Sequence, residues 1–448
     1  MKHLLLILSC CILPVASFAQ GSFKKDILFL SSEALGGRAP GGQEDSIARQ
    51  WIAARFAGAG LSPLPGHASH EQAFEVITRY WYDARLALPG EEAPAFVHHE
   101  DFQVIRHGEQ DSLSLECVFI GDGVGEILPV VEGKAVIRYS RPLPASLGGR
   151  GKRAGMDDLV AAGAKAIIHV HSPGIPISER EFRSPGGGSY PVTTLTLLAS
   201  NLKYFVDERH ARRYDSLLTV PGCLPAAAPA GKRVELVVKR HEERVTTANV
   251  TGIKRGTTGR VMIIGAHHDH LGRDKVTGER FPGANDNASG VAMLLELAER
   301  YKGVTTACDL VFVAFGCEER GIRGSRYFVE NLPVDKEKIA VMINLDMLGD
   351  LRDDTLYHAG YHRDFQPFLE KAVGQTGIAL QEKDCGLSDQ VHFMTRGIPT
   401  LFFCTGGQER FKQWHTTGDR EELVNYEGMA RIARLLDDVI AALDDAER

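Results

Sequence analysis

The stretch Val261–Gly290 limits the possible folds of this 448-residue chain more than any other segment. It begins with the apolar run Val261–Ile264, which a Gly-Ala pair ends, and this pattern predicts a buried strand that finishes in a tight turn. His267 and Asp269 follow immediately, beyond the carboxyl end of a strand, where open α/β sheets bind their ligands. Asp286 comes next, just before a predicted helix. The stretch therefore predicts an α/β fold with a polar site at one edge of its sheet.

Three later apolar runs are followed by further potential ligands. The run DLVFVAF precedes Glu318 and Glu319, the run IAVMINL precedes Asp346, and the run IPTLFF precedes His415. Each motif alone is typical of a polar loop or a solvated turn, but together they place imidazole and carboxylate groups after separate strands. Such nitrogen and oxygen ligands suit zinc, and two zinc ions bridged by a carboxylate need about five of them.

The motifs AHHDH, GANDNASG, CEERGIRGS, NLDMLG and WHTTGD resemble those of the di-zinc aminopeptidases of peptidase family M28. They cover the chain from about Val261 to Asp419, and the earlier segment LSSEALGGRAPGG resembles the N-terminal part of that family. The resemblance implies a zinc exopeptidase-like α/β fold, with a three-layer arrangement in which helices flank a mixed β-sheet. It also implies a peptide substrate.

The resemblance further implies a role for each potential ligand. His267 and Asp346 would hold one zinc ion, and Glu319 and His415 would hold a second. Asp286 would bridge the two ions, so that each chain would bind two Zn²⁺ ions.

Four more residues of the expected site follow from the same resemblance. Glu318 would be the general base, and Asp269 would contact His267 and fix the orientation of its imidazole. Trp414 stands where many relatives carry a tyrosine that stabilises the oxyanion, so its indole N–H is a candidate substitute. Asp389 matches a family position near the substrate, while Gln390 stands where relatives often have histidine. We therefore assign Trp414 and Asp389 to substrate binding.

The segment from residue 76 to residue 240 has a different texture. Strand-like pieces such as GKAVIRYS and AKAIIHVH alternate there with Gly and Pro turns. This segment resembles a protease-associated domain, a β-rich module often inserted into this peptidase family. We therefore expect residues 20–75 and 241–448 to form the zinc peptidase domain, and residues 76–240 to form the insert.

The N-terminus predicts export. A basic start, an apolar core from Leu4 to Val15 and small residues before Gln20 are typical of a secretory signal peptide over residues 1–19. The expected location is therefore the periplasm or the medium. A lipoprotein with lipid on Cys10 or Cys11 is the alternative, which we rank lower because its apolar region would be very short. No later run has the roughly 18 apolar residues of a membrane span.

The composition argues against some functions but assigns none. The formal net charge of −7 is mild and gives no basic footprint for nucleic acid. Eight cysteines are scattered without a CxxC motif, so their spacing assigns no disulfide. Cys317, next to the proposed base, is expected to be a small apolar filler rather than a nucleophile. The oligomeric state stays open.

Two other functions compete with the aminopeptidase. WHTTGD also resembles the related glutaminyl cyclases, which keep one zinc ion and convert N-terminal glutamine to pyroglutamate. A catalytically silent peptide-binding module built around the insert is the second alternative. Hydrolysis is favoured because every ligand of both zinc ions is present and the Glu318-Glu319 pair is intact. The sequence thus predicts an exported enzyme that removes N-terminal residues with a metal-activated water.

Overall fold

A computed structural model describes residues 22–448, except 91–92, 122, 124–127, 141–152, 171–189, 207–227, 275–276 and 375. The predicted signal peptide, including Cys10 and Cys11, lies outside the described residues, and so does Cys223. The chain divides into two compact units: unit 1 comprises residues 1–78 and 244–448, and unit 2 comprises residues 79–243. The kinship of the inserted segment to protease-associated domains stays a prediction.

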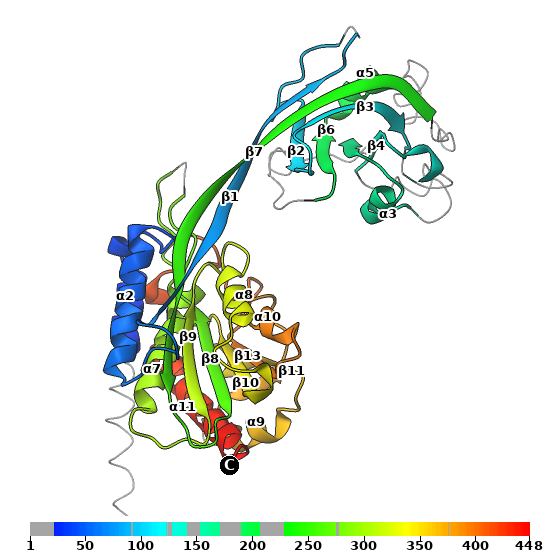
Figure 1. Ribbon diagram of the computed structural model, residues 1–448. Coiled ribbons are helices and arrows are strands. Elements are labelled where there is room, and N and C mark those ends of the chain that lie inside the picture. Colours follow the sequence, from blue (N-terminus) through cyan, green and yellow to red (C-terminus); the bar gives the residue numbers. More distant parts are fainter. Residues whose placement is uncertain are drawn as a thin grey trace, which may run out of the picture. The chain divides into compact units, whose positions relative to one another are not determined.

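A mixed β-sheet forms the centre of unit 1, with the strand order β12-β11-β13-β10-β8-β9-β7 (Figure 1). The neighbours among β9, β8, β10 and β13 pair in parallel, whereas β7 and β11 run antiparallel to β9 and β13. The strands are β7 (Ala228–Lys254), β8 (Val261–His267), β9 (Asp309–Phe315), β10 (Ile339–Leu345), β11 (Thr355–Tyr361), β12 (Ala379–Glu382) and β13 (Thr400–Cys404).

Helices cover both faces of this sheet because its central strands are buried along their whole length. Residues of β8 alternate between two cores: Met262 and Ile264 belong to one, and Val261 and Ile263 belong to the other. Helices α2, α7, α9 and α11 pack on the first core, and α8 and α10 on the second. The predicted mixed sheet flanked by helices is therefore confirmed. These helices are α2 (Gln43–Gly58), α7 (Gly290–Arg300), α8 (Arg323–Glu330), α9 (Gln366–Val373), α10 (Gln390–Met394) and α11 (Tyr426–Asp445).

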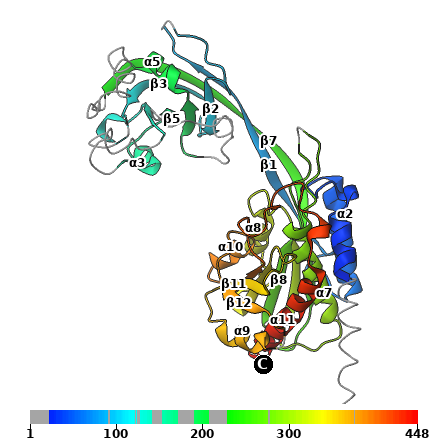
Figure 2. The same cartoon turned by 180° about the vertical axis from the view of Figure 1, so that it is seen from behind.

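Unit 2 contains further strands of the same 13-stranded sheet, joined through β7, and it has hydrophobic clusters of its own. Several of its strands and helices are labelled in Figure 2. Its strand order is β7-β3-β4-β5-β6-β2, in which β3 to β6 pair in parallel and the outer strands β7 and β2 pair antiparallel. Its elements are β1 (Glu71–Ala87, shared with unit 1), β2 (Phe102–Arg106), β3 (Ser112–Phe119), β4 (Ala135–Tyr139), α3 (Met156–Ala161), β5 (Ala166–Val170), β6 (Thr193–Leu197) and α5 (Leu202–Phe205). Among the residues described in both units, no helix is long and apolar enough to cross a membrane.

A buried arginine fixes the loops at the carboxyl edge of the unit 1 sheet. The guanidinium of Arg38 donates hydrogen bonds to the carbonyl oxygens of Leu30, His268, Pro282 and Gly283. These oxygens belong to the N-terminal helix of the described chain, the loop after β8 and the loop before α7. One side chain therefore joins three segments that the sequence separates widely.

We expect Arg38→Met to lower the free energy of unfolding by roughly 3–5 kcal/mol, because it leaves buried carbonyl oxygens without donors. Chemical denaturation measures this change. Arg326→Met is the control, since Arg326 is half exposed and pairs with Glu330 on the surface, and should cost less than about 1 kcal/mol. An equally small effect at both positions would contradict the structural role of Arg38.

Candidate metal centre

The carboxyl ends of β8, β9 and β10 converge on one cavity of unit 1. The strand β8 ends at His267, β9 leads through a Gly-Cys turn to Glu318 and Glu319, and β10 leads directly to Asp346. The cavity has a volume of about 320 Å³. Its lining includes His267, Asp286, Glu318, Glu319, Asp346, Met347, Leu387, Ser388, Phe402, Trp414 and His415.

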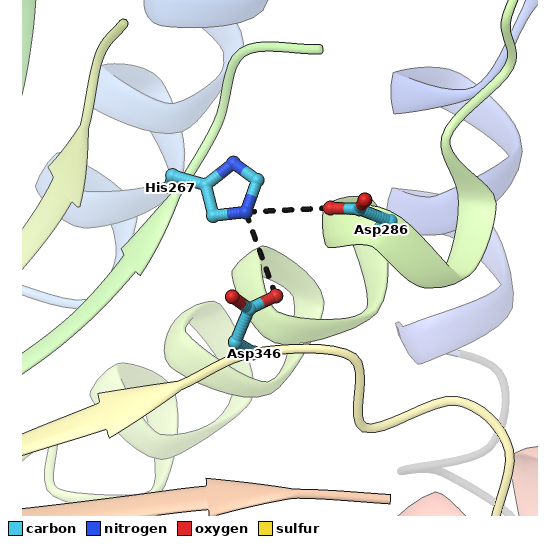
Figure 3. A group of neighbouring side chains, drawn as sticks. All are labelled: His267, Asp286 and Asp346. Atoms are coloured by element: carbon cyan, nitrogen blue, oxygen red, sulfur yellow. Dashed lines mark ion pairs between the residues drawn. The ribbon is translucent and has the colours of Figure 1, made fainter. Parts of the chain in front are cut away.

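A first ligand group surrounds the imidazole of His267 (Figure 3). Its Nε2 lies 3.4 Å from Oδ1 of Asp286 and 3.5 Å from Oδ1 of Asp346. Two ligands of a tetrahedral zinc ion, each about 2.0–2.2 Å from the metal, lie about 3.4 Å apart. The three atoms thus have the spacing of ligands around one ion. Oδ1 of Asp346 is also buried without a hydrogen-bond donor among the described residues, which suits a cation.

A second group uses the other oxygen of the same aspartate. Nε2 of His415 lies 3.2 Å from Oδ2 of Asp286 and 3.1 Å from Oε2 of Glu319. Asp286 therefore turns Oδ1 to the first group and Oδ2 to the second. This is the arrangement that a carboxylate needs in order to bridge two metal ions. The five predicted metal ligands are brought together, and their donor chemistry fits zinc.

His270 also belongs to this cluster, although the sequence motifs did not predict it. Its side chain is completely buried, and its Nδ1 lies 2.7 Å from Oε1 of Glu319. His270, Asp286 and Glu319 also lie close enough together to form a candidate metal-binding group. The available signal was the third histidine of AHHDH, but its spacing did not reveal a partner 49 residues away.

Asp269 supports the turn that carries both glutamates. Its Oδ1 accepts the N–H of Glu318 at 2.8 Å, and its Oδ2 accepts the N–H of Glu319 at 3.2 Å. The predicted contact with His267 is closer through the backbone, because Nδ1 of His267 lies 3.2 Å from the Asp269 carbonyl oxygen and 3.8 Å from its carboxylate. Asp269 therefore positions the Glu318-Glu319 turn as well as the imidazole.

Glu318 has the electrostatic surroundings of a base. Burial raises the pKa of its carboxyl group well above the ordinary value, although the nearby His267 opposes this shift. The carboxylates of Asp389 and Asp346 raise the pKa further. A carboxylate with a raised pKa accepts a proton more readily near neutral pH, which is what general base catalysis requires.

Asp419, the last residue of WHTTGD, holds the loop of the bridging aspartate. Its buried carboxylate accepts the backbone N–H groups of Asn285 at 2.8 Å and Asp286 at 2.9 Å. Burial raises the pKa of this carboxyl to about 6, and the two backbone hydrogen bonds oppose the shift. The position of Asp286 is therefore fixed through its main chain.

The two predicted substrate-binding residues are placed differently. Trp414 lines the cavity, and its ring stacks on His415 with a centroid distance of 3.9 Å. Asp389 is completely buried and is not among the residues that line the cavity, whereas its neighbour Ser388 is. A disulfide between Cys385 and Cys404 joins the segment just before Ser388 to the end of β13.

Comparison with known proteins finds sequence similarity to peptidases. Residues 249–440 match the model of peptidase family M28. The chain is 31% identical over 216 residues to "Aminopeptidase YwaD" of Bacillus subtilis, covering 45% of each chain. It is 32% identical over 200 residues to "Probable lipoprotein aminopeptidase LpqL" of Mycobacterium tuberculosis, covering 39% of this chain and 38% of that one. The matched segments thus span less than half the length of these curated relatives.

Solved structures extend the likeness to the whole fold. An aminopeptidase from Aneurinibacillus sp. strain AM-1 aligns with a TM-score of 0.56 and 21% identity over 94% of this chain and 93% of its own. The structure of BSAP, a zinc aminopeptidase from Bacillus subtilis, aligns with a TM-score of 0.55 and 22% identity over 95% of both chains. At these identities the likeness shows the fold.

The fold and the cluster at the sheet edge define an α/β protein in which two groups of potential metal ligands share one carboxylate, that of Asp286. The match to peptidase family M28 covers residues 249–440, which is less than half of the chain.

We expect the purified protein to bind two divalent metal ions per chain, because each oxygen of Asp286 faces its own ligand group. His415→Ala should lower the content toward one ion, and Asp286→Ala should lower it toward zero. Elemental analysis after dialysis measures the content, and His67→Ala, at an exposed histidine, is the control that keeps both ions. An unchanged content in Asp286→Ala would contradict the bridge.

Proposed function

We propose that this protein is a zinc aminopeptidase that removes single residues from the N-terminus of peptides. The observation that carries the proposal is the position of Asp286, whose two oxygens face separate ligand groups inside one cavity. The match of residues 249–440 to the model of family M28 supports it, and so do relatives named as aminopeptidases. The matched structure described as a zinc aminopeptidase supports the choice of metal.

In this proposal the five ligands divide as the family resemblance implies: His267 and Asp346 would hold one ion, Glu319 and His415 would hold the other, and Asp286 would be shared. Zinc bound there would act as a Lewis acid that polarises the carbonyl group of the substrate and lowers the pKa of a coordinated water toward neutrality.

Glu318 moves the proton in this reaction. Its carboxylate takes a proton from the attacking water and delivers it to the nitrogen of the leaving amine. Its raised pKa suits both halves of the transfer, because the group must accept a proton and then release it. Trp414 lines the cavity, and its indole N–H is the candidate donor to the oxyanion.

The cavity favours the end of a chain over its interior. Glu318, Glu319 and Asp346 give it an acidic floor, which attracts a free α-ammonium group. Met347, Leu387 and Phe402 add apolar surface beside that floor. We therefore propose that the enzyme prefers an apolar first residue with a free amine.

Two alternative functions predict different experimental results. A glutaminyl cyclase needs one zinc ion, and the complete second group around His415 disfavours it. A silent binding module has no need of a base, and the partly buried Glu318, with its raised pKa beside the ligand groups, disfavours it.

We also propose that the protein is exported. The basic and apolar N-terminus supports this, as does the likeness to a mycobacterial protein named as a probable lipoprotein aminopeptidase.

Glu318→Gln should keep both metal ions and lower kcat roughly 100- to 10,000-fold, because it removes proton transfer and spares the ligands. Steady-state kinetics together with metal analysis checks this. Glu299→Gln, at a surface glutamate of α7 that pairs with Lys302, should leave kcat unchanged. Near-wild-type turnover of Glu318→Gln would remove Glu318 from the mechanism.

A substrate panel tests the reaction itself. We expect hydrolysis of leucyl and other apolar aminoacyl amides, and no hydrolysis of their N-acetylated forms, because acetylation removes the charge that the acidic floor attracts. Product masses are measured beside those from glutaminyl peptides. Loss of ammonia without cleavage would favour the cyclase, and equal hydrolysis of free and acetylated substrates would refute recognition of the amine.

A further inference from the structure

His270 is a completely buried imidazole that contacts a proposed ligand without being one of the five. Its Nδ1 lies 2.7 Å from Oε1 of Glu319. An ionised carboxylate only accepts hydrogen bonds, so Nδ1 of His270 carries the proton and donates it. Glu319 thus has one oxygen engaged by His270 and the other, Oε2, directed to His415 at 3.1 Å.

The distances separate the roles of the two imidazoles next to Glu319. Two ligands of one tetrahedral zinc ion lie about 3.4 Å apart. His415 approaches this spacing, at 3.1 Å from Glu319 and 3.2 Å from Asp286. The 2.7 Å between His270 and Glu319 is shorter and matches a charge-assisted hydrogen bond. His270 therefore has the geometry of a donor to a ligand, and His415 has the geometry of a ligand.

The ring of His270 is held in place by the backbone around it. A Cβ atom on Gly283 would lie 2.6 Å from ring atoms Cγ and Cδ2, so the imidazole packs directly against a position that only glycine leaves open. The backbone N–H of His270 donates to the carbonyl oxygen of Arg38 at 3.1 Å. The ring therefore cannot swing away from Glu319 without moving the loop before α7.

We propose that His270 is a positioning residue for the second metal ion: its Nδ1–H holds Oε1 of Glu319 and so presents Oε2 to the ion shared with His415 and Asp286. This inference rests on the proposed function. Residues that hydrogen-bond to a metal ligand fix the orientation of that ligand before the metal binds. We assign this role to His270, which is not one of the five ligands.

The proposal predicts an effect on one of the two sites only. His270 donates to Glu319, whereas the first group consists of His267, Asp346 and the other oxygen of Asp286. Loss of the donor leaves the Glu319 carboxylate free to rotate, and such losses typically weaken metal binding roughly 10- to 100-fold. The second site should weaken by that factor while the first keeps its affinity.

The experiment compares His270→Ala with His270→Asn in the full-length protein. An asparagine amide places an N–H close to the position of Nδ1, so it restores the donor without restoring an imidazole. Zinc is titrated into the stripped protein against a chelating dye, which gives a Kd for each site. We expect His270→Ala to raise one of the two Kd values roughly 10- to 100-fold and to leave the other unchanged, and His270→Asn to keep both within about threefold of wild type.

His268→Asn is the matched control. His268 is equally buried and lies two residues away, but its Nε2 contacts the carbonyl oxygen of Ala248 rather than a ligand. A general disturbance of the loop would therefore weaken zinc binding in His268→Asn as well, whereas the proposal expects both Kd values to stay unchanged. Thermal unfolding of all variants checks that they are folded.

The possible results separate the role of His270 from the proposed function of the protein. Wild-type affinity in His270→Ala would overturn the positioning role and leave the proposed function intact. Complete loss of one ion in both His270 variants, as in His415→Ala, would make His270 a ligand and also overturn it. A wild-type protein that binds no zinc would refute the proposed function, and this inference with it.

Discussion

The cluster depends on the orientation of one carboxylate, that of Asp286. The two ligand groups meet only because its oxygens point in different directions, and the side chain gains that orientation through its backbone. Asp419 accepts the N–H groups of Asn285 and Asp286, and Arg38 holds the carbonyl oxygens just before them. Both the N–H groups and the carbonyl oxygens of this loop are therefore held by buried side chains, and the fixed backbone sets the orientation of the Asp286 carboxylate.

The same cavity brings several carboxylates together. Asp286, Glu318, Glu319 and Asp346 line it, and burial disfavours charge there. The imidazoles of His267 and His415 offset part of this charge: burial lowers their pKa values, but the adjacent carboxylates outweigh it and raise the pKa of His415 to about 10 and that of His267 well above its ordinary value. Bound metal ions would replace these protons as the positive charge, which couples metal binding to stability.

The sequence revealed the fold and most of the cluster because both depend on local patterns. Continuous apolar runs mark the buried strands, and the polar residues that end them, such as His267 and Asp346, must meet at one edge of a parallel sheet. His270 and Asp419 could not be assigned in this way, because their hydrogen bonds join residues 49 and more than 100 positions apart. The pairing of Cys385 with Cys404 was open for the same reason.

The side-chain amide of Gln390 holds part of the cavity lining in place. Its Oε1 accepts a hydrogen bond from Asn344 at 3.0 Å, and its Nε2 donates to the carbonyl oxygen of Gly386 at 2.8 Å. Asn344 also donates to the hydroxyl of Ser388, which lines the cavity. These hydrogen bonds join the segment around Ser388 to β10, and the disulfide joins Cys385 to the end of β13. At the position where the family resemblance leads us to expect histidine, this chain therefore has a buried amide that fixes the cavity lining.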